Sequence, residues 1–188
     1  MEQAKELYIL FTDTGTLLSK LIKSYTKIPL NHASISFDAN LQEVYSFGRK
    51  SQGNPFLGGF VRENLYSPLF QEASCAVYRC TVSHSSYVRI RAQIREFEQN
   101  QERYKYNLIG LFGVMLQLEW EREDRFFCSQ FVASVLENGG VKLVDKPPVL
   151  VTPADLQQTG MLMQVYSGSL NEYLGHDVLF EKGCVQTA

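Results

Sequence analysis

Alternating hydrophobic and polar positions predict a β-hairpin in the first third of the chain. The sequence HASISF at 32–37 places polar residues at every second position and apolar residues between them. This alternation is typical of a half-buried strand. The segment 42–47 has strand character as well, and turn-forming residues at 38–40 separate the two. A hairpin is therefore expected, with His32 at its open end.

The remaining pattern mixes strands with helices and lacks the regular alternation of a parallel α/β protein. Apolar or alternating runs predict strands at 7–11, 75–82 and 161–166, the last as a core strand. Helical spacing of apolar residues predicts helices at 16–25, from the serines at 83–86 to about 101, at 126–138 and from Pro153. Residues 48–59 are interpreted as a surface connection, and the state of 104–118 is left open. The sequence predicts an α+β fold with 1–188 as a single domain.

Composition and charge narrow the classes of function. The chain has 188 residues, 45% of them hydrophobic, and a net charge of -2. Ordinary hydrophobicity favours a folded globular chain, and the absence of a basic excess argues against a nucleic-acid partner. The longest apolar run, 108–118, is too short to span a bilayer, which needs about 20 residues. The N-terminus lacks the pattern of a secretory signal, so a cytoplasmic location is expected.

The position of Cys128 is the main chemical signal. Four cysteines lack paired C-x-x-C spacing, so neither a disulfide framework nor a metal site is expected. Cys128 lies in FFCSQFVASVLEN, within the first turn of a predicted helix that stops at Gly139. Unpaired N–H groups at a helix start favour a thiolate and can stabilise the oxyanion formed when the thiolate attacks a carbonyl. Cys128 is therefore the candidate nucleophile, although a small buried hydrophobe is the common alternative.

His32 is the candidate base because small polar residues share its strand face and leave room for a partner. A three-residue turn at 38–40 would place Ser46 opposite His32 as the residue that orients the imidazole. A turn of two or four residues would instead bring Tyr45 and Glu43 to the His32 face. Arg49 directly follows this strand and is a candidate for binding a substrate carboxylate.

Two local patterns together resemble a known family. NHASISFD followed by EVYSFG, and then FFCSQFVASVLE, is similar to the circularly permuted papain-like hydrolases of the NlpC-type superfamily, which includes the YiiX-like proteins. In those members a histidine on a strand precedes a cysteine at a helix start, reversing the papain order. The resemblance implies an antiparallel sheet packed against helices, and a Cys nucleophile, a His base and a polar third residue at Cys128, His32 and Ser46. Several relatives carry a carboxylate where this chain has Ser46.

The function expected from this reading is hydrolysis of an amide bond in a small peptide or acyl-amino-acid, through an acyl-enzyme on Cys128 and without a metal or organic cofactor. A lipid-directed thiol acyltransferase or esterase would use the same residues with a different acceptor. A catalytically silent binding module of the same fold is the third alternative, suggested by the weak hydroxyl at position 46.

Overall fold

The computed structural model describes residues 3–14, 29–49, 58–106 and 125–175. The predicted helix at 16–25 and most of the segment 104–118 lie outside these residues. The described residues form eight strands: β1 (Lys5–Asp13), β2 (His32–Ser36), β3 (Val44–Arg49), β4 (Gly58–Arg62), β5 (Ser74–Val82), β6 (Lys105–Tyr106), β7 (Arg125–Phe126) and β8 (Met163–Ser169). The helices are α2 (His84–Gln99), α4 (Cys128–Asn138) and α5 (Pro153–Gln158), with short 3-10 turns η1 (Pro68–Phe70) and η2 (Pro148–Leu150).

All eight strands belong to one sheet, in the order β7-β6-β4-β3-β2-β1-β5-β8. Every pairing is antiparallel except that of β6 with β7. Helices and a largely antiparallel sheet therefore make an α+β fold, as the sequence predicts. Because β2, β3 and β4 are neighbours, residues at 32–36, 44–49 and 58–63 come together at the centre of the molecule.

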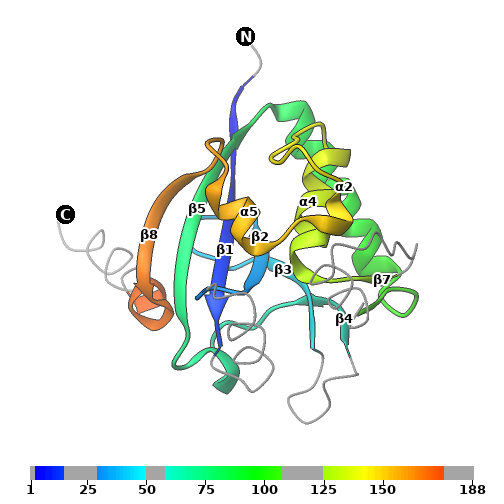
Figure 1. Ribbon diagram of the computed structural model, residues 1–188. Coiled ribbons are helices and arrows are strands. Elements are labelled where there is room, and N and C mark those ends of the chain that lie inside the picture. Colours follow the sequence, from blue (N-terminus) through cyan, green and yellow to red (C-terminus); the bar gives the residue numbers. More distant parts are fainter. Residues whose placement is uncertain (1–2, 15–28, 50–57, 107–124, 176–188) are drawn as a thin grey trace, which may run out of the picture.

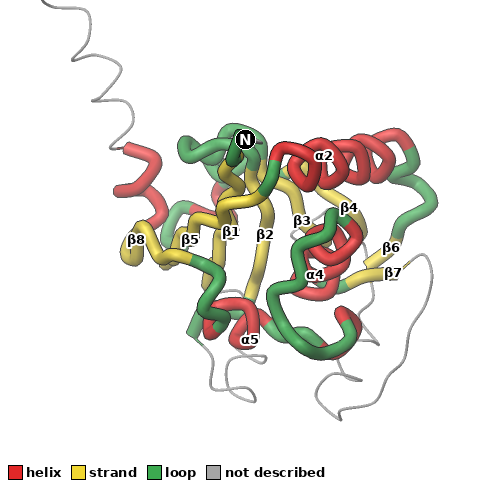
Figure 2. Tube along the Cα trace, turned by 90° about the horizontal axis from the view of Figure 1, so that it is seen from above, coloured by secondary structure: helices red, strands yellow, loops and turns green. Residues whose placement is uncertain are grey.

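The main hydrophobic core lies between the sheet and the helices α2 and α4, which lie beside each other (Figures 1 and 2). The alternation in β2 works as predicted, because Ala33 and Ile35 are buried in this core. From α4 the core receives Phe131 and Leu136, both with no exposed surface. Burying a side chain of this size stabilises the fold by about 1.5–3 kcal/mol. The predicted apolar face of α4 is thus the face that fixes its first turn against the sheet.

The hairpin between β2 and β3 has a wider connection than predicted. The observed register pairs Ile35 with Tyr45 and Ser36 with Val44, so a three-residue turn at 38–40 is wrong. The Asp38 carboxylate accepts the main-chain N–H groups of Gln42 and Glu43, each at 3.0 Å, and holds the longer loop. Side-chain capping of this kind stabilises loops that hydrophobic patterning does not reveal.

Two further expectations need correction. The segment 48–59 is not a connection throughout, since β3 extends to Arg49 and β4 begins at Gly58. The predicted core strand at 161–166 exists as β8, but it forms one edge of the sheet, and Met163 and Val165 are exposed. Their apolar character alone therefore does not indicate burial.

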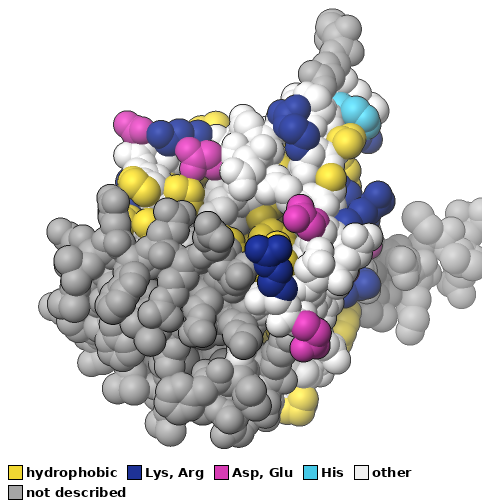
Figure 3. Space-filling view, turned by 90° about the vertical axis from the view of Figure 1, so that its right-hand side faces the viewer, with side chains coloured by type: hydrophobic (Ala, Val, Ile, Leu, Met, Phe, Trp, Pro, Cys, Tyr) yellow, Lys and Arg dark blue, Asp and Glu magenta, His cyan; other side chains and the backbone are white. Residues whose placement is uncertain are grey.

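Ser83 caps α2 by accepting the N–H of Ser86, and Thr152 caps α5, as the sequence predicts. The structure adds a capping box between Thr152 and Asp155 at the start of α5. Charged side chains of both signs are interspersed on the face shown in Figure 3. No helix among the described residues has the length and apolar character that crossing a membrane requires.

Candidate active site

The first turn of α4 places Cys128 against the beginning of β2. Phe127 is the N-cap residue, in an extended conformation, and Cys128 is the first helical residue. The next residue, Ser129, anchors this end because its hydroxyl donates to the carbonyl of Val151 at 2.7 Å. The Cys128 sulfur lies 3.9 Å from the main-chain oxygen of Asn31, directly before His32. The prediction that Cys128 begins a helix is therefore confirmed.

His32 is the first residue of β2, and its imidazole interacts with the Cys128 thiol closely enough to lower the pKa of that thiol. Its Nε2 atom lies 2.6 Å from Oε1 of Glu63. Since Nε2 faces the carboxylate, the other ring nitrogen, Nδ1, is the one left for the sulfur. The His32 side chain retains 20% of its exposure, whereas Glu63 retains 5%. A cysteine, a histidine and a carboxylate are thus connected in series.

Glu63 directly follows β4 and is held by three side chains. Besides His32, it accepts the hydroxyl of Ser46 on Oε1 at 2.5 Å and that of Ser34 on Oε2 at 3.0 Å. Its own main-chain N–H donates to the carbonyl of Val44 at 2.8 Å, which continues the pairing of β4 with β3. A buried carboxylate needs such partners because an unpaired buried charge is strongly unfavourable. The network therefore fixes both the charge and the orientation of Glu63.

The electrostatics of this series favour a thiolate and an imidazolium. Burial raises the pKa of the Cys128 thiol, but the hydrogen bond and charge of His32, with the main-chain N–H groups of Ala33 and Ser129, lower the pKa below its ordinary value. Burial lowers the pKa of His32, but the charge of Glu63 and the contacts with Cys128 and Glu63 raise that pKa to about 10. His32 and the two serine hydroxyls hold the pKa of Glu63 below its ordinary value against the effect of burial. The proton therefore resides on the imidazole.

Ser46 has a different place from the one predicted. By extension of the observed register, Gly48 rather than Ser46 is opposite His32, and Ser46 is opposite Ser34. The displacement is by two residues, so Ser46 stays on the His32 face of the sheet. Its hydroxyl binds Glu63, and no hydrogen bond joins Ser46 to His32 among the described contacts. Ser46 is thus a positioning residue for the carboxylate that orients the imidazole.

The two alternatives for the third residue are elsewhere. Glu43 pairs with Arg91 of α2, and Tyr45 is buried in the main core, where its ring stacks on Phe60. Glu63 is not among the predicted site residues because 48–59, which contains the start of β4, is interpreted from the sequence as a surface connection. The sequence GGFVRE at 58–63 gives little strand signal, because two glycines precede two apolar and then two charged residues without alternation.

Replacing Ser46 by alanine tests the positioning role. The Glu63–His32 contact does not depend on Ser46, so we expect alkylation of Cys128 at neutral pH to slow by no more than about tenfold, the equivalent of one charge-assisted hydrogen bond of about 1.4 kcal/mol. Rates with iodoacetamide measure this, and Ser36→Ala, which alters a hydroxyl bonded to Asp38 instead, is the matched control. A decrease in the alkylation rate as large as that caused by a Glu63 substitution would contradict the positioning role and make Ser46 the group that mainly sets the rate.

Neither Arg49 nor His84, the other histidine among the described residues, adds to the described geometry of the site. Arg49 ends β3, but its side chain lies outside the described part of the molecule. His84 begins α2, on a different element from Cys128. Among the residues that the structure describes, no group of three His, Cys, Asp or Glu side chains could hold a metal ion.

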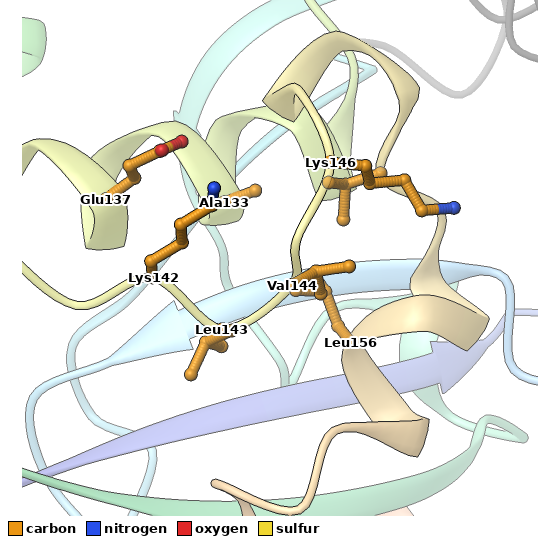
Figure 4. Close-up of a pocket in the computed structure, with 8 residues that line it drawn as sticks. Ala133, Glu137, Lys142, Leu143, Val144, Lys146 and Leu156 are labelled. Carbon is orange, nitrogen blue, oxygen red and sulfur yellow. The ribbon is translucent and has the colours of Figure 1, made fainter.

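A pocket borders α4, and Cys128 is not among the residues that line it (Figure 4). It is lined by the second half of α4, the segment at 142–146, Val151 and Leu156. Its two lysines already bind carboxylates, Lys142 to Asp145 at 2.8 Å and Lys146 to Asp155 at 2.7 Å. It therefore offers no free cation to a substrate and is separate from the candidate active site.

Comparison with known proteins does not place the chain in a family. Neither the family models nor the curated proteins give a match to the sequence. The geometry around Cys128 is therefore the main indication of function.

Proposed function

We propose that this protein is a cysteine hydrolase that cleaves an amide bond in a small peptide or acyl-amino-acid, with the permuted papain-like arrangement that the sequence resembles. The observation that carries the proposal is the series Cys128–His32–Glu63 at the N-terminal end of α4. A nucleophile contacts a base, and a third group orients that base, which is the geometric signature of covalent catalysis.

The proposed reaction uses the charges already in place. The Cys128 thiolate attacks the substrate carbonyl carbon, a C–S bond forms, and the carbonyl π pair moves onto oxygen. The His32 imidazolium then gives its proton to the leaving nitrogen as the C–N bond breaks, which yields an acyl-enzyme and a free amine. Water attacks the thioester next and His32 takes the proton of that water. The C–S bond then breaks, the carboxylic acid leaves, and the thiolate–imidazolium pair is restored.

Glu63 supports activity over the alternative of a silent binding module. A hydroxyl at the third position would hold an imidazolium weakly, whereas an ionised carboxylate at 2.6 Å interacts with it strongly. A binding module also has no need for a buried carboxylate whose pKa is kept low beside a histidine. Perturbed ionisable groups of this kind cluster at functional sites.

Intact-protein mass spectrometry tests the proposal directly. The chain is incubated with an N-acetyl-amino-acid p-nitroanilide, and with phosphatidylcholine vesicles in a parallel arm, and is quenched in acid. We expect the acetyl-aminoacyl mass on the chain, located on Cys128 by peptide mapping and absent in Cys128→Ala. A fatty-acyl adduct alone would indicate lipid acyl transfer or esterolysis instead. No adduct in either arm, with no release of nitroaniline, would contradict covalent catalysis on these two classes of substrate.

A further inference from the structure

The ladder between β2 and β3 stops just before the candidate active site. Its last registered pair toward the site is Ile35 with Tyr45. Continuation of this register would join Ala33 to Phe47, but these two residues are not paired. On the other side of β3, Phe47 is in register with Phe60 of β4, and its ring contacts that of Phe131, with centroids 5.1 Å apart. The start of α4 therefore lies where the ladder would have continued.

The Cys128 sulfur takes a position on the free edge of β2. It lies 3.9 Å from the carbonyl oxygen of Asn31, and the main-chain N–H of Ala33 contributes to lowering the pKa of the thiol. Ile35 pairs with β3 along this edge, and residues two apart in a strand present their main-chain groups along the same edge. The N–H of Ala33, which would donate to β3 in a continuous sheet, therefore points to the side of β2 on which the sulfur lies.

We infer that the main-chain N–H of Ala33 is a catalytic group of this site, which stabilises the Cys128 thiolate from the strand while the helix end stabilises it from the other element. The inference rests on the proposed function and adds to it a donor that no side-chain pattern encodes.

This donor acts on the nucleophile before the attack. When sulfur forms its bond to the substrate carbon it loses its negative charge, so the hydrogen bond from Ala33 stabilises the free thiolate more than the acylated state. Removing the donor should therefore decrease the thiolate fraction at low pH. Where Cys128 is fully ionised, the rate should stay the same or rise, because a thiolate of higher pKa is intrinsically more nucleophilic.

An amide-to-ester substitution isolates this single group. Incorporating L-lactic acid at position 33 of the full chain replaces the N–H by an ester oxygen and keeps the methyl group. The pH dependence of iodoacetamide alkylation at Cys128 is then measured without any substrate. We expect the midpoint of the profile to rise by about 1 to 2 pH units, the equivalent of one hydrogen bond to a charged group. The alkylation rate on the plateau at high pH should not decrease.

The matched control places lactic acid at Ala154, whose N–H lies in the first turn of α5, where no intrahelical acceptor exists. Its profile should equal that of the natural chain. An unchanged midpoint in a folded position-33 ester, checked by thermal unfolding, would overturn the inference. Because alkylation needs no substrate, this failure is distinguishable from the absence of an acyl adduct, which would contradict the proposed function.

A second measurement covers the case in which the position-33 ester does not fold. In the natural chain, the amide proton of Ala33 should shift downfield in NMR spectra as Cys128 ionises, with the midpoint of the alkylation profile, and this movement should disappear in Cys128→Ala. An Ala33 amide proton that stays unchanged through that midpoint would overturn the inference without any backbone substitution.

Discussion

Replacing Glu63 by glutamine is expected to slow acylation of Cys128 by about 100-fold or more, with little change in folding. Glutamine keeps the size of the side chain and its capacity to bind the Ser34 and Ser46 hydroxyls. It removes the negative charge that is the main factor raising the pKa of His32. In a serine protease, exchanging the corresponding carboxylate for an amide costs about 10,000-fold. A thiolate is the better nucleophile, so the loss here should be smaller. Single-turnover release of nitroaniline measures it.

The control for this variant is Glu43→Gln. Glu43 is also a partly buried carboxylate with a cationic partner, Arg91, but it lies outside the Cys128–His32 series. We expect a change of less than about twofold in acylation, because surface ion pairs contribute up to about 1 kcal/mol to stability and nothing to the reacting groups. Equal losses in the two variants would show that general destabilisation, rather than the charge beside His32, sets the rate.

The parts of the site that lie on regular elements could be predicted from the sequence. The apolar spacing after Cys128 gives a helix whose first turn contains the sulfur, and the alternation after His32 gives a strand. Both patterns follow from the burial of one face of each element. The order of the two residues in the chain then agrees with the permuted family that the sequence resembles, and their contact needed only the packing of α4 on the sheet.

The third residue could not be predicted because it depends on register and on a short strand. Hydrophobic alternation fixes which face a residue occupies, and Ser46 was correctly placed on the His32 face. Alternation does not fix a shift by two residues, which preserves the face, and here the Asp38 loop sets that shift. The two glycines at 58–59 are typical of a loop and do not indicate a strand, so the sequence does not predict β4 or the carboxylate that directly follows it. In this chain the carboxylate beside His32 is that of Glu63, which directly follows β4.

The Ala33 donor could not be predicted for a related reason. It is a main-chain group, and its availability depends on where two strands separate rather than on which side chains they carry. The separation is itself caused by aromatic packing, since Phe47 contacts Phe126 and Phe131 at centroid distances of 5.0 and 5.1 Å. The side chains that place the sulfur are therefore core residues with no chemical role of their own.

Replacing His32 by alanine is expected to slow alkylation of Cys128 at pH 7 by about 100-fold. The imidazolium supplies the hydrogen bond and the charge that lower the pKa of the thiol, and burial of Cys128 then acts unopposed by them. The buried cysteines Cys75 and Cys80 show this effect, since burial raises their pKa values to about 12 and about 11. A thiol pKa two above the pH leaves about 1% thiolate. Iodoacetamide rates, with adducts located by peptide mapping, measure the loss.

The dependence of the rate on pH tests the same role of His32 independently. In the natural chain the pKa of Cys128 is lowered and that of His32 is raised to about 10. The ion pair therefore forms as pH rises past the thiol pKa and loses its cation as pH passes about 10. The rate of amide cleavage, which needs the imidazolium as an acid, should form a plateau between these limits and decline above about pH 10.

In His32→Ala the plateau should be lost, and the rate of alkylation should instead increase tenfold per pH unit through the neutral range. His84→Ala, which changes a histidine at the start of α2, should keep the natural profile. A plateau that persists without His32 would show that the helix end and the Ala33 amide ionise Cys128 by themselves, and the assigned role of the imidazole would be wrong.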